Sequence, residues 1–242
     1  MEKSAGEHIP KMANSEIAET LRHIPLYAVA RKVLETEPGA FLACKRAGIF
    51  EIYTQEYVDE LAAFITARFG KQAEVVEACA GDGRLTKALQ QRGIAVTAVD
   101  DRSRGTGNQR SLHRPLRAPS SRLADRHPAN KSPGPDIAYP DWVIKGDAVE
   151  YVTQHQPDVV IASWVECRDD LDQRLAETGI PVIIIAETNL GGTTGTEEFW
   201  ERDDFAYEHL KTISAYNLST ADAIRDVSSL GPSTSTHLVT MN

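Results

Sequence analysis

From about Ala73 onward, short apolar segments alternate with segments of helical periodicity. Strands are predicted where mostly apolar residues run together, at 73–78, 94–99, 141–145, 158–163 and 181–187. Helices are predicted between them at 84–92, 147–155 and 169–178, and Gly93 and Gly179 follow the first and last of these, where glycine commonly ends a helix. This alternation is typical of an α/β fold with a doubly wound, mostly parallel sheet flanked by helices. Segments 210–216 and 235–241 are candidates for edge strands.

The residues before this alternation are predicted to be helical, from Ser15 to about Gly70. Apolar residues recur there near helical spacing, at Ile17, Leu21, Ile24, Tyr27, Ala28 and Val29. The residues 37–39, Glu-Pro-Gly, interrupt the pattern, and a longer helix follows from Thr54, a suitable N-cap, to Gly70. We therefore expect an N-terminal helical extension over residues 1–70 and a main domain over residues 71–242.

Residues 101–140 break the alternation. They contain six of the twelve prolines, with clustered Ser, Arg and His, so that neither a regular helix nor a central strand fits. A loop of this length is typically functional or disordered, which leaves a surface insertion and a substrate-contacting lid as alternatives. Eight Lys or Arg residues and one acid lie between Arg102 and Lys131, so the insertion is basic. His113 and His127 lie within it and are candidate bases if the loop folds over a site.

Composition narrows the class of protein. The 242 residues, 41% hydrophobic and 25% charged, suffice for one large globular domain with a helical annex. We expect a soluble, cytoplasmic protein, because we recognise neither a secretory signal nor the ~18 apolar residues of a membrane span. A net charge of −9 argues against bulk nucleic-acid binding. Cys44, Cys79 and Cys167 lie far apart and the histidines are scattered, so we expect free thiols and no metal site.

The most informative segment is VVEACAGDGRLTKAL, residues 75–89, which passes from a strand pattern through two glycines into a helix pattern. In open α/β sheets, glycines of the first β–α turn allow a ligand to approach the backbone at the carboxyl ends of the strands. Thr86 stands where a dinucleotide fingerprint needs a small residue, which counts against NAD or FAD. No Gly-Lys-Ser/Thr follows the turn, which excludes a Walker A loop.

Acidic residues stand at three successive strand ends. Glu77 ends the first predicted strand, where its carboxylate could reach a hydrogen-bond donor over the glycines. Asp100 ends the second, in the region where an acid accepts ribose hydroxyls, and Asp147 follows the third, where it suits an adenine amino group. Together they suit a ligand that carries an ammonium, a ribose and an adenine but no phosphate.

These features resemble the class I S-adenosylmethionine (SAM)-dependent methyltransferases over roughly residues 73–200. The matching runs are EACAGDGRLTKAL, VTAVDD, GDAVEYV and DVVIASW, in that order. The resemblance implies a Rossmann-like fold and SAM as the cofactor. By this likeness Glu77, Gly81 and Gly83 would line the methionine part, Asp100 the ribose and Asp147 the adenine. Further cofactor contacts are expected at Ala80, Asp101 and Ala148.

The sequence also departs from the family. Cys79 stands where many members have the first glycine of the loop. Residues 163–166 are Ser-Trp-Val-Glu and not Asn/Asp-Pro-Pro-Tyr/Phe, which argues against a DNA adenine or release-factor substrate. Because they follow the fourth strand, Ser163, Trp164 and Glu166 are candidates to face the transferring methyl, with Glu166 as the general base. Glu187, which ends the fifth strand, is a candidate substrate ligand.

The leading hypothesis is a SAM-dependent methyltransferase that acts on a small-molecule acceptor by in-line methyl transfer, without a membrane partner. The basic insertion leaves an RNA-directed methyltransferase open, and binding that is lost at high salt would identify it. A third alternative is a protein that keeps the fold without transferring methyl groups, as a scaffold or with other chemistry, since fold does not determine function. The sequence does not fix the oligomeric state; a homodimer is compatible with it.

Overall fold

The computed structural model describes residues 12–103, 137–165, 169–187, 194–223 and 234–242. Its helices are α1 (Asn14–Arg22), α2 (Tyr27–Thr36), α3 (Ala40–Arg46), α4 (Gln55–Phe69), α5 (Arg84–Gln91), α6 (Ala148–His155), α7 (Leu171–Ala176), α8 (Glu197–Trp200) and α9 (Lys211–Ser214), with the 3-10 helix η1 (Thr220–Ala223). Its strands are β1 (Glu74–Ala78), β2 (Ala95–Asp100), β3 (Ile144–Lys145), β4 (Val159–Ser163), β5 (Val182–Ala186), β6 (Phe205–His209) and β7 (Ser235–Met241). The strands and helices predicted between residues 73 and 187 are confirmed, although β3 is confined to the last two residues of its segment.

The strands form one sheet in the order β3-β2-β1-β4-β5-β7-β6. The first five are parallel, while β7 runs antiparallel to both β5 and β6. The order 3-2-1-4-5 is that of a doubly wound sheet, in which the direction of winding reverses between β1 and β4. The predicted Rossmann-like α/β fold, mostly parallel and flanked by helices, is confirmed.

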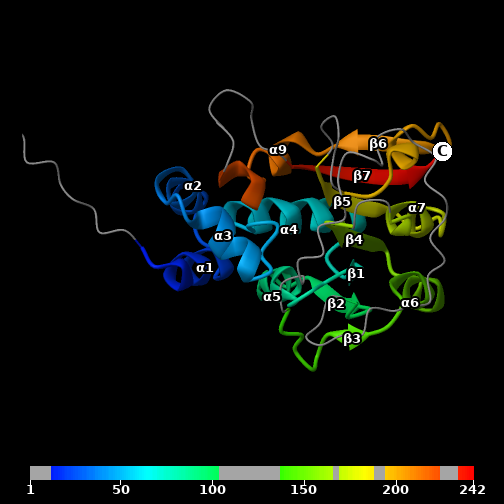
Figure 1. Cartoon of the computed structure of the whole chain (residues 1–242). Helices are drawn as coiled ribbons and strands as arrows, with labels where there is room; N and C mark the ends of the chain where they lie inside the picture. Colours follow the sequence, from blue (N-terminus) through cyan, green and yellow to red (C-terminus); the bar gives the residue numbers. More distant parts are fainter. Residues whose placement is uncertain (1–11, 104–136, 166–168, 188–193, 224–233) are drawn as a thin grey trace, which may run out of the picture.

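Helices cover both faces of the sheet, because alternate residues of each buried strand point to opposite faces. On one face Val75, Ile161 and Ile183 pack with α4, α5 and α9. On the other face Val76, Val160 and Val182 pack with α6 and α7. Figure 1 shows these two helical layers on opposite sides of the sheet. Both faces are apolar, which is why the central strands read as continuous hydrophobic runs.

The N-terminal helices divide between two cores. α1, α2 and α3 bury Ile17, Leu21 and Leu34 in a cluster of their own, which Leu218 joins from the other end of the chain. α4 instead packs on the sheet. Its predicted cap is confirmed: the Thr54 hydroxyl accepts a hydrogen bond from the backbone N–H of Tyr57 (3.2 Å), and Gly70 follows the last residue. The helical extension therefore reaches the sheet through α4.

Three expectations need correction. Segment 210–216 is not a strand; it contains the short helix α9, and the strand of this region, β6, precedes it. Segment 235–241 is a strand, but it lies inside the sheet between β5 and β6 and not at its edge. Val29 does not belong to the buried stripe of α2, since 44% of it is exposed. None of the described helices is long and apolar enough to cross a membrane.

Candidate functional site

A cavity of about 310 Å³ opens at the carboxyl ends of β1, β2 and β4. This is the edge of a doubly wound sheet at which ligands bind. All of the residues predicted to contact the cofactor line the cavity except Gly83: Glu77, Ala80, Gly81, Asp100, Asp101, Asp147 and Ala148. Ser163 and Trp164, predicted to face the acceptor, line it too, and Phe50, Glu51 and Tyr53 enter from the segment before α4.

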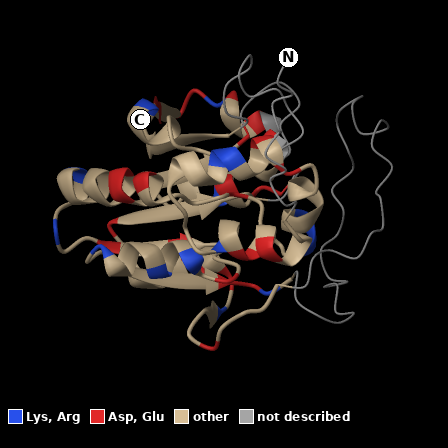
Figure 2. Cartoon of the chain, turned by 90° about the vertical axis from the view of Figure 1, so that its left-hand side faces the viewer, with Lys and Arg blue, Asp and Glu red and all other residues tan. Residues whose placement is uncertain are grey.

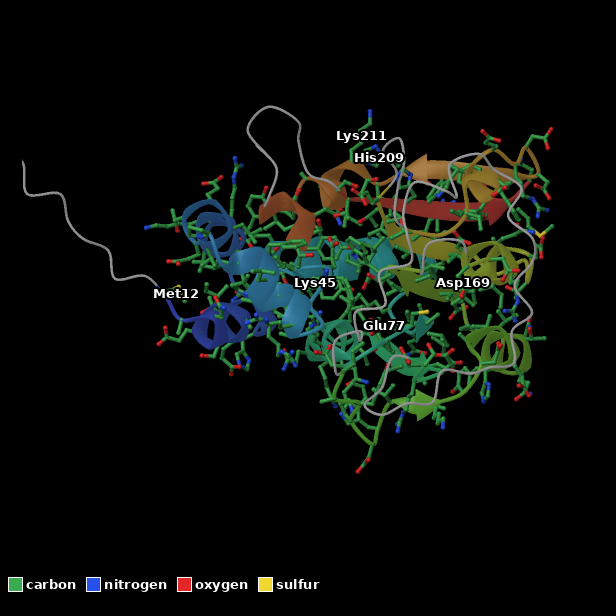
Figure 3. The ribbon with its side chains drawn as sticks, in the orientation of Figure 1. Met12, Lys45, Glu77, Asp169, His209 and Lys211 are labelled. Carbon is green, nitrogen blue, oxygen red and sulfur yellow. The ribbon has the colours of Figure 1, made fainter. Side chains whose placement is uncertain are left out.

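Glu77 lies at the centre of the molecule between the N-terminal helices and the strands (Figure 3), with only 2% of it exposed. Its Oε2 accepts hydrogen bonds from the backbone N–H of Thr86 (2.8 Å) and from the Thr86 hydroxyl. Burial raises the pKa of Glu77 to about 7, although the bonds from Thr86 act in the opposite direction. Its Oε1 accepts no hydrogen bond from the described residues, so one oxygen remains for a ligand.

The two glycines of the turn have different tasks. Gly81 has φ +57°, and a Cβ atom there would meet no atom within 4 Å, so its backbone borders the open cavity. Gly83 has φ +69°, but a Cβ atom there would lie 2.2 Å from the ring of Trp142. Gly83 is thus required by the packing of Trp142, and it does not line the cavity. Cys79, where the family resemblance expects a glycine, also has a left-handed backbone (φ +56°).

Asp100 is bound to the backbone of both flanking turns. Its Oδ2 accepts from the N–H of Gly81 (2.9 Å) and its Oδ1 from the N–H of Arg102 (2.7 Å), and 8% of the residue is exposed. Burial raises the pKa of Asp100, opposed by these two bonds. The neighbouring Asp101 is exposed and accepts from the N–H of Ser103 (2.8 Å). Asp100 therefore ties β2 to the glycine turn of β1.

Asp147 caps α6. Its Oδ1 accepts from the N–H groups of Val149 (2.8 Å) and Glu150 (3.0 Å), and its Oδ2 lies 3.4 Å from Nη2 of Arg174. Partial burial would raise the pKa of Asp147, but the bond from Glu150 and the charge of Arg174 outweigh it, so the pKa lies below its usual value. Capping accounts for Oδ1, and among the described residues Oδ2 makes only the longer contact to Arg174.

Two side chains that the sequence did not single out complete the wall toward β4. The Tyr53 hydroxyl donates to Oγ of Ser163 (2.9 Å), and Nε1 of Trp164 donates to Oε2 of Glu51 (2.9 Å). Trp164 has φ +53°, a conformation that is costly for a residue with a side chain and that is often found at functional sites. The available signal for Glu51 was a single acid inside the apolar run at 49–53.

Arg84, the first residue of α5, is a third residue that the sequence reasoning passed over. Its side chain is 15% exposed, its Nε lies 3.2 Å from Oδ1 of Asp82, and its guanidinium lies 5.6 Å from the Tyr53 ring centroid. The contact to Asp82 has the distance of an ion pair without hydrogen-bond geometry. Nε and Nη1 are buried and receive no hydrogen-bond partner from the described residues. The guanidinium of Arg84 is therefore a mostly buried cation at the wall of the cavity.

Of the other predicted site residues, one does not line the cavity and three are not described. Glu187 is buried and its N–H donates to the Thr194 hydroxyl (3.0 Å), but it does not line the cavity. Glu166, the candidate base, and His113 and His127 lie outside the described residues, as does most of the basic insertion. Figure 2, which views the molecule from the side of the N-terminal helices, shows Lys and Arg interspersed with Asp and Glu along the described ribbon. The described residues contain no group of three or more His, Cys, Asp or Glu placed to hold a metal ion.

The fold and the cavity define a Rossmann-like α/β protein with a cavity of small-molecule size at the carboxyl ends of its strands. No family model and no curated protein matches the chain. It is similar to solved structures of methyltransferases. One is the magnesium protoporphyrin IX methyltransferase of Synechocystis PCC 6803 with bound SAM, with 11% identity, a TM-score of 0.41, and coverage of 96% of this chain and 98% of that one.

Two other solved structures are similar at the same level. The 1,6-didemethyltoxoflavin-N1-methyltransferase of Burkholderia thailandensis has 16% identity, a TM-score of 0.35, and coverage of 96% of this chain and 92% of that one. A tRNA methyltransferase of B. subtilis has 11% identity, a TM-score of 0.35, and coverage of 75% and 65%. At these TM-scores the likeness assigns no activity or substrate to this chain.

Proposed function

We propose that the chain is a SAM-dependent methyltransferase that acts on a small-molecule acceptor. The observation that carries the proposal is one cavity on which the glycine turn, Glu77, Asp100 and Asp147 converge from successive strands. Its volume is near the lower end of the roughly 300–1,000 Å³ of small-ligand sites. Seven carboxyl groups and two guanidinium groups line it, which favours a cationic ligand over a polyphosphate.

The unused polar atoms fit the amino-acid end of such a cofactor. Oε1 of Glu77 can accept from an ammonium, and the guanidinium of Arg84, which lines the cavity, can donate to a carboxylate. The two side chains form no ion pair with each other. Opposite charges that face one cavity without pairing are suited to a zwitterion, in which each charge of the ligand meets its complement.

When bound, SAM supplies an electrophilic methyl group on a sulfonium. The residues of this chain then bind and orient: Asp100 holds the turn on which the cofactor would lie, and Ser163 and Trp164 border the space for the acceptor. Correct placement of two reactants can lower a barrier by roughly 7–11 kcal/mol, so alignment can supply much of the catalysis.

Isothermal titration with SAM and S-adenosylhomocysteine (SAH) tests this function. The wild type should bind both in the micromolar range, and Asp100→Ala should weaken both at least about tenfold, because the Gly81 turn loses its anchor. The control is Asp59→Ala, which removes an exposed carboxylate from α4, away from the cavity. Folded wild-type protein that binds neither ligand would contradict the proposal and favour a scaffold that keeps the fold.

A further inference from the structure

One carboxyl group of the cavity belongs to none of the expected cofactor contacts. Glu51 lies between α3 and α4 in an apolar stretch, and only 2% of it is exposed. It lines the cavity together with Ser163 and Trp164, on the side where β4 ends. A carboxyl group in such a place is unfavourable unless polar partners or a ligand compensate it.

Three neutral donors hold this carboxyl group. Nε1 of Trp164 donates to Oε2 (2.9 Å), Nδ2 of Asn217 donates to Oε1 (2.8 Å), and the Thr234 hydroxyl lies 3.1 and 3.2 Å from the two oxygens. An ionised carboxylate offers about four acceptor sites, and these three groups supply one hydrogen each, so the described residues leave one site unfilled. Indole and amide N–H groups only donate, so the bonds from Trp164 and Asn217 favour the charged form of Glu51. A neutral Gln side chain at position 51 would connect the same three side chains without burying a charge.

No ion pair from the described residues compensates Glu51. The titratable groups that face it are Asp222 of η1, Tyr53 on the same segment and Tyr57 of α4, and Glu77 of β1 acts on the same tyrosines. Burial raises the pKa of Glu51 to about 8, while the bonds from Trp164 and Asn217 lower it. The carboxyl group therefore changes charge close to neutral pH, where a proton acceptor works best.

Aromatic rings border the same part of the cavity. The rings of Phe50 and Trp164 have centroids 5.9 Å apart and are tilted by 33°. The strained backbone of Trp164 is held by its N–H, which donates to the carbonyl of Ile185 (3.1 Å). Aromatic faces attract cations, most strongly where water is excluded. A buried carboxylate without a counter-ion beside such rings fits a ligand that brings a positive charge.

We propose that Glu51 receives the proton of the methyl acceptor, and that this acceptor is an amine that binds as its ammonium ion against Glu51 and the rings of Phe50 and Trp164. The inference rests on the proposed methyl transfer. The ammonium gives one proton to Glu51, the freed nitrogen lone pair forms the bond to the methyl carbon, and the electrons of the broken C–S bond stay on the sulfur of the sulfonium donor. The carboxyl group then passes its proton to water.

Calorimetric titration with benzylammonium, with benzyl alcohol as its neutral counterpart, tests the site with and without SAH at pH 6.5 and 8.5. Wild-type protein should bind benzylammonium about tenfold more tightly at the higher pH, because Glu51 is then ionised, and benzyl alcohol should show no such change. Glu51→Gln should abolish the difference and leave SAH affinity unchanged. Glu74→Gln, which alters an exposed carboxylate at the start of β1, should behave as the wild type.

Each other outcome has a definite meaning. The proposal is overturned if benzylammonium does not bind, if Glu51→Gln keeps the pH difference, or if SAH and benzylammonium are lost together, as a purely structural role would require. Should wild-type protein bind neither SAM nor SAH, the proposed function fails, while the titration without SAH still decides the ammonium site.

A measurement on the wild type covers the case in which Glu51→Gln does not fold. Carbon-13 NMR of protein labelled at the Glu side-chain carboxyls should show one resonance that titrates with a midpoint near pH 8. Saturation with benzylammonium should move that midpoint to lower pH, because a bound cation favours the ionised form. An unchanged midpoint would overturn the proposal.

Discussion

Arg84 is the side chain on which recognition of the cofactor's amino-acid end should depend most. Arg84→Gln is expected to weaken SAH binding about 10- to 100-fold, since a hydrogen bond to a charged group contributes roughly 1.5–3 kcal/mol. Affinity for 5′-methylthioadenosine, which lacks the carboxylate, should stay within about threefold. Calorimetry with the two ligands measures both effects, and Arg92→Gln, at the end of α5 and paired with Asp59, is the control. Equal losses for both ligands would mean that Arg84 supports the fold instead.

At the scale of single residues, the sequence predicts where a side chain lies better than it predicts which groups that side chain contacts. Glu77, Asp100 and Asp147 could be expected at the cavity because each ends or follows a strand, and parallel strands end at one edge of the sheet. The contacts of Asp147 depend on two helices, because α6 supplies the backbone N–H groups that it caps and α7 supplies Arg174. Glu51 was missed because its partners come from residues distant in sequence, such as Thr234, 183 positions after it. Arg84 was missed because its contact with Tyr53 depends on how the segment before α4 packs against the glycine turn.

At the scale of elements, prediction succeeded where the hydrophobic periodicity of a segment agreed with the residues that begin or end it. The buried strands are continuous apolar runs, and α4 and α5 have both an apolar stripe and a glycine after the last turn. It failed at residues 205–216. There β6 buries mainly Phe205, so its hydrophobic signal is weak, as expected of an edge strand. The apolar residues Leu210 and Ile213 are three apart and pack on one side of α9, a spacing too short to distinguish helix from strand.

Gly195, just before α8, lies close to Asp172 of α7, and a larger residue at position 195 should push these two segments apart. A Cβ atom there would lie 1.9 Å from Oδ2 of Asp172 in α7, and the residue has φ +64°. Gly195→Ala should therefore lower the free energy of unfolding by about 2 kcal/mol or more, measured in urea. Gly93→Ala, with φ +82° and no atom within 4 Å, should lose only the roughly 1 kcal/mol of backbone strain. Equal losses would show that the contact with Asp172 relaxes at no cost.

At the scale of the whole molecule, the cavity combines two parts of the fold. The sheet supplies Glu77, Asp100 and Trp164 at its carboxyl edge, and the segment after α3 supplies Glu51 and Tyr53. The N-terminal cluster also reaches the glycine turn directly, since Arg22 of α1 pairs with Asp82 (3.4 Å). The side of the cavity lined by Glu51 and Tyr53 therefore depends on the N-terminal part of the chain, and periodicity alone could not reveal this because it says nothing of how separate layers meet.

Burying Glu51 and Glu77 at the centre of the molecule should make its stability depend on pH. Both have a pKa raised by burial, to about 8 and about 7, from 4.5 in an unfolded chain. Between pH 6.5 and 8 the folded protein holds protons that the unfolded chain has lost, so stability falls as pH rises. The half-buried His237, whose pKa is lowered to about 4, is uncharged in the folded state throughout this range and affects stability mainly below pH 6.5.

The expected loss of unfolding free energy between pH 6.5 and 8 is about 2–2.5 kcal/mol, since one unit of pKa difference corresponds to roughly 1.4 kcal/mol. Urea unfolding at several pH values measures it, and Glu51→Gln should remove most of the slope because the amide does not titrate. Stability that is flat or rises over this range would mean that both carboxyl groups are already ionised in the folded protein. A bound ammonium ion should flatten the slope of the wild type as well, because it stabilises the charged form of Glu51 that the fold alone disfavours.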